Sequence, residues 1–183
     1  MGSKRLPGKV MMDINGFPMI YYLLKRIQLS KVKDIYLASS TNKENDVLVD
    51  YVKKNFNKIN IFRGDENDVF SRYYNISIIN NLDVIIRVTA DCPLIDYRII
   101  DNMYSIFSNH NNMLDYLSNT APAEQRTYPD GMDVEIFSSE ALEKANNLNL
   151  SSFDLEHVTT CFLNSNYSFN SKKIDFKLNL SYL

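Results

Sequence analysis

Short apolar runs alternate with amphipathic stretches along most of the chain. After Pro18, apolar side chains recur every three or four positions, which predicts a helix over residues 19–27. The same spacing predicts helices over 45–56, 69–80, 99–107 and 154–164, and one that begins at Ser139. Continuous apolar runs predict strands over 34–40, 59–62, 83–89, 113–118 and 132–137. This alternation predicts an α/β fold with a mostly parallel sheet flanked by helices.

Polar clusters follow three of the predicted strands directly. They occupy residues 39–41, 63–65 and 89–91. In a parallel sheet, ligands bind beyond the carboxyl ends of the strands, where these clusters would meet. The sequence therefore predicts a ligand site at that edge of the sheet.

The loop at residues 2–9, GSKRLPGK, combines glycines with cations. Glycine lets backbone N–H groups turn toward a ligand, and Lys9 adds positive charge beside them. The loop therefore predicts a cradle for a polyphosphate, with a solvated basic tail as the alternative. It is not a Walker A loop, because the gap between Gly2 and Gly8 is one residue too long and Val10 follows the lysine.

Two groups of acidic residues are candidates for chemistry. Asp91 follows an apolar strand, where a carboxylate is placed to hold Mg²⁺; the alternative is a cap for a helix near Pro93. Asp133 and Glu135 share one face of a strand and could bind a metal or a hydroxylated substrate. For these two the alternative is an exposed, charged strand face.

Three further residues are candidates for substrate contact. Arg126 and Tyr128 lie close in sequence to the second acidic group. His157 follows Glu156 in a predicted helix, and histidine titrates near neutral pH.

Composition limits the class of protein. A chain of 183 residues with 45% hydrophobic content suits one globular domain over 1–183. Its net charge of −2 argues against nucleic acid as a partner. No apolar run reaches the length of a membrane span, and no signal peptide opens the chain. With only Cys92 and Cys161 as thiols, we expect a cytoplasmic protein with no membrane partner.

Six blocks of sequence together resemble one family in order and spacing. They are GSKRLPGK, YLASST, FRGDENDVFSRY, RVTADCPLID, YPDGMDVE and EHVT. In this respect the chain resembles the cytidylyltransferase-like family of spore coat polysaccharide biosynthesis protein F, which is related to CMP-KDO and CMP-sialate synthetases. The resemblance covers nearly all of the chain and implies a Rossmann-like nucleotidyltransferase fold.

The resemblance also implies an activity and a set of site residues. The implied reaction transfers CMP from CTP to an acidic sugar or similar acceptor, with Mg²⁺ and release of pyrophosphate, in surface polysaccharide biosynthesis. Its implied catalytic residues are Arg5, Lys9 and Asp91, with Asp91 as the metal ligand. The implied nucleotide-binding residues are Gly2, Ser3, Gly8, Ser39, Ser40 and Arg72. The implied substrate-binding residues are Arg126, Tyr128, Asp130, Asp133, Glu135 and His157.

The chain departs from the family pattern at both ends. Relatives carry an apolar strand before the position of Met1, and an R-x-T-x-D segment with a second metal-binding acid beyond Leu183. We therefore expect a domain truncated at both ends. Three possibilities stay open: the transferase described above, a nucleotidyltransferase acting on a phosphorylated amino-acid amide or a sugar phosphate, and an inactive homologue that only binds a partner. Relatives are commonly dimers, so a homodimer is also expected.

Overall fold

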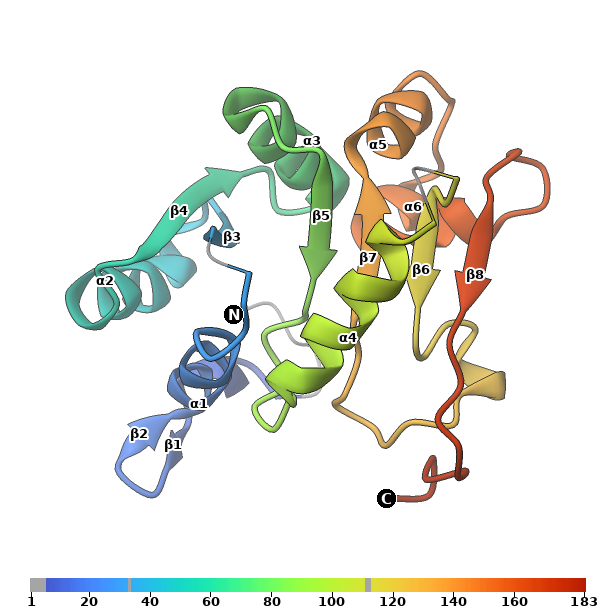
Figure 1. Ribbon diagram of the computed structural model, residues 1–183. Coiled ribbons are helices and arrows are strands. Elements are labelled where there is room, and N and C mark those ends of the chain that lie inside the picture. Colours follow the sequence, from blue (N-terminus) through green and yellow to red (C-terminus); the bar gives the residue numbers. More distant parts are fainter. Residues whose placement is uncertain (1–5, 33, 111–112) are drawn as a thin grey trace.

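The computed structural model describes residues 6–32, 34–110 and 113–183, which form helices packed on both faces of interrupted sheets (Figure 1). The helices are α1 Met19–Ile27, α2 Asp46–Asn55, α3 Val69–Asn80, α4 Tyr97–Ser108, α5 Ser139–Asn146 and α6 Ser152–His157. The strands are β1 Asp13–Ile14, β2 Phe17–Pro18, β3 Ile35–Ser40, β4 Ile59–Gly64, β5 Val84–Arg87, β6 Tyr116–Ser118, β7 Glu135–Ser138 and β8 Ser171–Lys173. Short 3₁₀ turns are η1 Lys9–Met11, η2 Lys43–Asn45, η3 Ala123–Gln125 and η4 Thr160–Leu163. None of the described helices has the length and apolar content to cross a membrane.

The strands pair in three groups. β1 and β2 form an antiparallel hairpin, and β3 pairs in parallel with β4, with Ser40 opposite Gly64. The other four strands form one sheet in the order β5-β7-β6-β8. In this sheet β7 runs antiparallel to both neighbours, while β6 and β8 are parallel.

The α/β class is confirmed, but the strand pairing is more mixed than the expected mostly parallel sheet. The connection from β6 to β7 contains only the short turn η3. Because a parallel return needs a longer crossover, usually through a helix, this connection favours an antiparallel neighbour.

The core divides into two clusters on opposite faces of the sheet. One cluster holds apolar residues of α1, α2 and α4, and the other those of α3, α5 and η4. Neighbouring residues in one strand belong to different clusters: Ile136 packs in the first and Phe137 in the second. This is the period-two alternation expected of a strand buried on both faces.

The predicted helix over 154–164 is wrong as a single element. α6 ends at His157, and the backbone of Val158 takes φ 68°, after which η4 begins. A β-branched residue rarely adopts positive φ, so the tertiary structure holds this turn in place. Val158 is fully buried, and the hydroxyl of Thr159 reaches into the core to Glu135.

Three strands are clearly shorter than predicted, among them β5 at Val84–Arg87, and the sequence analysis missed β8 and the two short strands β1 and β2. β6 begins at Tyr116 rather than at residue 113, and β7 begins at Glu135 rather than at residue 132. β8 lies in the polar C-terminal region, where no periodicity marks it. Two of its three side chains are exposed, which is common for an edge strand that pairs mainly through its backbone.

A buried polar network joins the strands of the four-stranded sheet. Glu135 of β7, 8% exposed, forms an ion pair with Arg87 of β5. Its Oε1 accepts hydrogen bonds from the Tyr116 hydroxyl of β6 at 2.7 Å and from Thr159 Oγ1 at 2.6 Å. Burial, reinforced by the charge of Glu135, raises the pKa of Tyr116, so its hydroxyl remains a neutral donor. Glu135 therefore does not lie on an exposed, charged strand face, which was the alternative interpretation. Its carboxylate is also closed to a ligand in this conformation.

Replacing Glu135 should destabilise the fold strongly. Glu135→Ala leaves the Arg87 guanidinium buried without its counter-charge, so we expect the free energy of unfolding to fall by about 3–5 kcal/mol in urea denaturation. Asp130→Ala is the control, because Asp130 pairs with Arg126 at the surface and should change stability by at most about 1 kcal/mol. Equal losses in the two variants would contradict the structural role of the network.

Candidate active site

Lys9 and Asp91 meet beyond the carboxyl end of β5. Gly8, at φ 72°, turns the backbone into η1, which begins at Lys9. Lys9 Nζ lies 2.6 Å from Asp91 Oδ2, although 82 residues separate them in sequence. The two side chains are 29% and 44% exposed, so an incoming ligand can reach both. The structure thus places a cation and a carboxylate together where the sequence predicts a ligand site.

Thr89 orients the carboxylate of Asp91. Its hydroxyl donates to Asp91 Oδ1 at 2.6 Å. Partial burial opposes ionisation, but the bonds from Lys9 and Thr89 outweigh it and lower the pKa of Asp91 below its ordinary value. Asp91 is therefore a carboxylate at neutral pH.

Asp91 does not cap a helix, which removes the alternative interpretation of this residue. α4 begins at Tyr97, and its cap is Asp96, whose Oδ1 accepts from the Arg98 backbone N–H at 2.9 Å.

Asp133 brings a second carboxylate to this end of the sheet. Its Oδ2 lies 3.9 Å from the Sγ of buried Cys92, the residue that follows Asp91. Its Oδ1 is buried and makes no hydrogen bond among the described residues. Burial raises the pKa of Asp133, and nearby Asp130 adds to the effect. A carboxylate kept in such a place is typical of a functional site.

Asn119, which the sequence analysis missed, fixes the backbone around Asp133. Its Oδ1 accepts from the Val134 N–H at 2.9 Å, and its Nδ2 donates to the Met132 carbonyl at 2.8 Å. Asn119 is fully buried. An isolated asparagine in a loop gives no pattern from which this role could have been predicted.

The remaining candidates for substrate binding lie in two places, the loop between β6 and β7 and the end of α6. Arg126 and Asp130 form an ion pair of 2.8 Å in the loop before Asp133, and both act on its pKa. Tyr128, in the same loop, is buried with its ring 5.2 Å from that of Phe176, and burial raises its pKa. His157 is exposed at the end of α6 and packs on Phe153 with ring centroids 4.2 Å apart.

Ser39 and Ser40 are buried at the end of β3, so their side chains are not open to a ligand in this conformation. Ser40 Oγ accepts from Asn45 Nδ2 at 2.7 Å. Arg63, which the sequence analysis placed in the polar cluster 63–65, donates to the Ser40 carbonyl at 2.8 Å and to the Asn42 carbonyl at 2.9 Å. These contacts fix the loop that follows β3.

Arg72 is also buried and fixes the loop between β4 and α3. Its Nε donates to the Asp65 carbonyl at 2.7 Å and its second terminal nitrogen to the Glu66 carbonyl at 2.8 Å. A Cβ at Gly64 would lie 2.9 Å from Arg72 Cγ, so glycine is required for the close approach. Arg72 thus supports this loop, and the neighbouring Asp68 caps α3.

The catalytic candidate Arg5 and the nucleotide-binding candidates Gly2 and Ser3 lie outside the described residues.

A family model described as cytidylyltransferase matches residues 1–173. The chain belongs to the cytidylyltransferase family.

Relatives in this family include proteins named for polysaccharide and acidic-sugar chemistry. Uncharacterized protein MJ1063 of Methanocaldococcus jannaschii is 35% identical over 159 residues, covering 86% of this chain and 61% of that protein. Spore coat polysaccharide biosynthesis protein SpsF of Bacillus subtilis is 30% identical over 65% of this chain and 51% of its own length. The 8-amino-3,8-dideoxy-manno-octulosonate cytidylyltransferase of Shewanella pealeana is 32% identical over 60% of this chain and 44% of its own. The chain thus spans about half the length of these relatives.

A solved cytidylyltransferase from Leptospira borgpetersenii has the same fold. It is 31% identical with a TM-score of 0.91, and the match covers all of this chain and 75% of the other. The expected nucleotidyltransferase fold is thereby confirmed.

The site has the donor chemistry that suits Mg²⁺ in a cytidylyltransferase. The described residues contain no group of three His, Cys, Asp or Glu side chains that would enclose a metal. Asp91 instead offers one half-exposed carboxylate. This fits Mg²⁺, which is commonly held by one or two carboxylates together with substrate phosphates and water.

Neutralising Asp133 should stabilise this cytidylyltransferase domain. The pKa of Asp133 is raised in the folded state, so the folded chain binds this proton more tightly than the unfolded chain does. The contribution of Asp133 to the free energy of unfolding therefore falls as pH rises from its unfolded-state pKa through its folded-state pKa. We expect Asp133→Asn to raise the melting temperature by a few degrees at pH 7, since about 1 kcal/mol corresponds to 2–4 °C at this chain length.

The gain should vanish near pH 3, where the wild-type carboxyl is protonated. Glu124→Gln, at an exposed position of the same loop, is the control and should show no such pH-dependent gain. Destabilisation by Asp133→Asn at neutral pH would contradict this account of the residue.

Proposed function

We propose that this chain carries the nucleotide-transfer site of an enzyme that moves CMP from CTP to an acidic sugar, with release of pyrophosphate, for surface polysaccharide synthesis. The observation that carries the proposal is the contact of Lys9 with Asp91 at the carboxyl end of β5 in a member of the cytidylyltransferase family. The names of SpsF and of the octulosonate cytidylyltransferase support the sugar acceptor and its acidic character.

Lys9 has the properties needed to hold the triphosphate of CTP. Its ammonium is partly exposed and sits on a 3₁₀ turn that follows a glycine in the left-handed conformation. An exposed ion pair contributes at most about 1 kcal/mol, so the Lys9–Asp91 contact can open when phosphate oxygens compete for the ammonium. Arg5 is proposed to act beside it, as the resemblance implies.

Asp91 is proposed to hold Mg²⁺ once Lys9 has moved to the phosphates. The bound ion would spread the negative charge that develops on the phosphate oxygens. The task of the chain is then mainly positioning: Thr89 holds the Asp91 carboxylate, and Lys9 orients the leaving pyrophosphate. The acceptor hydroxyl oxygen attacks the α-phosphorus in line and loses its proton to solvent, while the bond between the α-phosphorus and the leaving pyrophosphate breaks. No side-chain nucleophile is needed.

The acceptor is proposed to bind over the loop between β6 and β7. Arg126 supplies the positive charge that suits an acidic sugar, and Asp133 supplies a carboxylate oxygen that lacks a hydrogen-bond donor within the described chain. That oxygen is buried in this conformation, so a sugar hydroxyl would satisfy it only after the loop moves to admit the acceptor. Tyr128 packs in the same loop, so the acceptor side is built largely from one segment of the chain.

We expect CTP with Mg²⁺ to raise the melting temperature of the chain by about 5–10 °C at ligand concentrations near a hundred times the dissociation constant. Lys9→Ala and Asp91→Ala should each lose most of this shift, because they remove the phosphate contact and the metal ligand. Arg98→Ala is the control: Arg98 also pairs with an aspartate, Asp96, but its side chain is exposed at the start of α4.

Two outcomes would overturn the proposal. Equal stabilisation by CTP, UTP, ATP and GTP would remove its cytidine specificity. A full CTP shift in Asp91→Ala would remove the metal assignment. Pyrophosphate release from CTP with candidate acidic sugars, compared with sugar phosphates, then tests the acceptor class.

A further inference from the structure

Both oxygens of the Asp91 carboxylate already have a donor. Lys9 Nζ lies 2.6 Å from Oδ2, and the Thr89 hydroxyl donates to Oδ1 at 2.6 Å. The ammonium of Lys9 therefore lies where a metal ion would bind this carboxylate. An ammonium and a divalent ion on one oxygen repel each other, because both carry positive charge. In this conformation Lys9 and a free metal ion compete for the same place.

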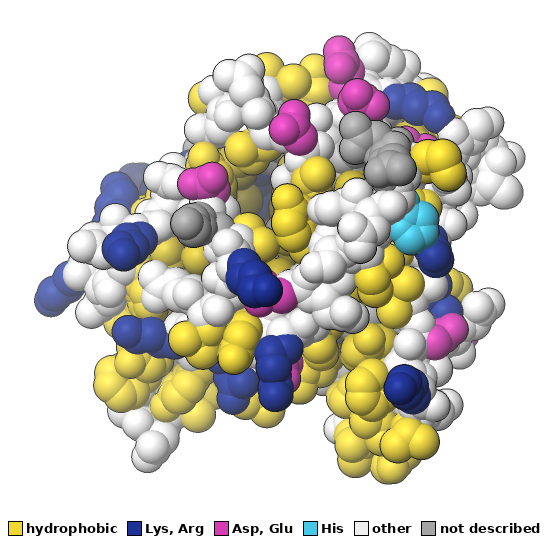
Figure 2. All heavy atoms as spheres, viewed as in Figure 1, with side chains coloured by type: hydrophobic (Ala, Val, Ile, Leu, Met, Phe, Trp, Pro, Cys, Tyr) yellow, Lys and Arg dark blue, Asp and Glu magenta, His cyan; other side chains and the backbone are white. Residues whose placement is uncertain are grey.

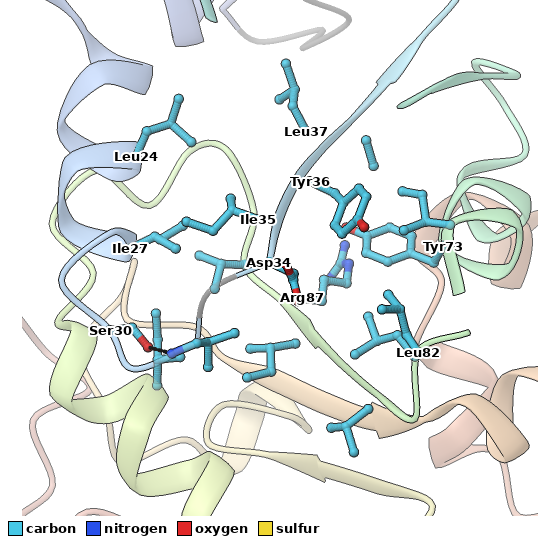
Figure 3. Close-up of a pocket in the computed structure, with 18 of the residues that line it drawn as sticks. Leu24, Ile27, Ser30, Asp34, Ile35, Tyr36, Leu37, Tyr73, Leu82 and Arg87 are labelled. Carbon is cyan, nitrogen blue, oxygen red and sulfur yellow. Dashed lines mark hydrogen bonds between the residues drawn. The ribbon is translucent and has the colours of Figure 1, made fainter. Parts of the chain in front are cut away.

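Asp91 has no second cation that could take the place of Lys9. Within the part of the chain that the structure describes, the only ion pair of Asp91 is the one with Lys9. The strand that leads to Asp91 ends in Arg87, which lies on the wall of a cavity of about 630 Å³ beside β5 (Figure 3). Arg87 already forms an ion pair with the buried Glu135. The charge of Asp91 is therefore balanced by Lys9 or by a ligand from outside the chain.

A second acid lies close to the pair. Asp133 Oδ2 is 3.9 Å from the sulfur of Cys92, the residue next to Asp91. When Lys9 leaves, this end of the sheet loses an ammonium and keeps its carboxylates, so it attracts a cation. A triphosphate carries several negative charges and can draw the ammonium away, because a partly exposed ion pair is weak. Binding of the phosphates thus opens a place for the metal.

We propose that Lys9 is the resident cation of the metal site, which closes Asp91 to a free divalent ion until a triphosphate draws the ammonium away. Nucleotide and metal then bind together, and each raises the affinity of the site for the other. This inference rests on the proposed metal-binding role of Asp91 and adds the order in which the site is filled.

The first test measures binding of Mn²⁺ alone, without nucleotide, to the full chain. Mn²⁺ prefers the same oxygen ligands as Mg²⁺, and it broadens the NMR signals of nearby amides, here those of residues 89–92. Lys9→Gln should lower the Mn²⁺ concentration at half-broadening by about fivefold, which is the upper end for an exposed ion pair. Adding Asp91→Asn should abolish this gain. Lys9→Arg keeps a cation and should stay within about twofold of the wild type.

A lysine–aspartate pair elsewhere on the surface provides the matched control. Figure 2 shows several acidic side chains beside lysines or arginines on the face that it presents. Lys173 Nζ lies 2.6 Å from Asp175 Oδ1, and Thr127 Oγ1 donates to the same carboxylate at 3.4 Å. Lys173→Gln changes the net charge as Lys9→Gln does but leaves Lys9 in place. It should therefore not change the broadening of residues 89–92 by Mn²⁺.

The second test measures binding of metal-free CTP, with EDTA present. Asp91→Asn frees Lys9, so this variant should bind metal-free CTP up to about fivefold more tightly than the wild type, although it binds CTP with Mg²⁺ less tightly. The gain should largely disappear when Lys9→Gln is added, which a double-mutant cycle measures. An equal gain in both backgrounds would show general repulsion by the carboxylate and would overturn the opening of the pair by nucleotide.

Four results of the Mn²⁺ titration would overturn the inference. They are equal affinity in the wild type and Lys9→Gln, an equal gain from Lys173→Gln, a gain that survives Asp91→Asn, and no binding at residues 89–92 in any variant. A gain in Lys9→Gln from a chain that binds no CTP would support closure of Asp91 by Lys9 and would remove the proposed function. Binding of CTP without the Mn²⁺ gain would do the reverse.

Discussion

The carboxylate of Glu135 joins four parts of the chain inside the sheet. It pairs with Arg87 of β5 and accepts hydrogen bonds from Tyr116 of β6 and Thr159 before η4. The same contacts set the position of the site, because Asp91 follows Arg87 by four residues and Asp133 precedes Glu135 by two. A pair that is costly to break when buried therefore holds the strands from which both site carboxylates extend.

The ion pair of the site has the opposite character. Lys9 and Asp91 are partly exposed, so water and salt screen their attraction and a phosphate ligand can replace the carboxylate. Thr89 and the backbone contacts of Asn119 keep the carboxylates in place while the lysine remains free to change partner. Rigid acids and an adaptable cation suit the proposed binding of a metal–triphosphate and the proposed release of pyrophosphate.

The interruption between β3 and β5 divides the carboxyl edge of the sheets. On one side, Arg63 and Arg72 fix the loops after β3 and β4 through backbone carbonyls. On the other side lie Asp91 and Asp133. The parallel pair β3–β4 is joined to the four-stranded sheet by helix packing and not by a continuous ladder of backbone hydrogen bonds among the described residues. The position of one half of the site relative to the other therefore depends on this helix packing.

The amino-acid pattern by itself determined the α/β class, most of the helices, and the residues that end β3, β4 and β5. It did so because the local spacing of apolar residues indicates which face of a helix or strand is buried, as with Ile20, Leu23 and Leu24 of α1. Only the tertiary structure decided what those residues do. Glu135 and Arg72 have the same charge chemistry as Asp91 and Lys9, yet they are buried and support the fold, because burial and partners depend on contacts between distant segments. For the same reason the break at Val158, the pairing of β8 and the gap between β3 and β5 have no local signal: each depends on which strand edge or core surface the folded chain places beside it.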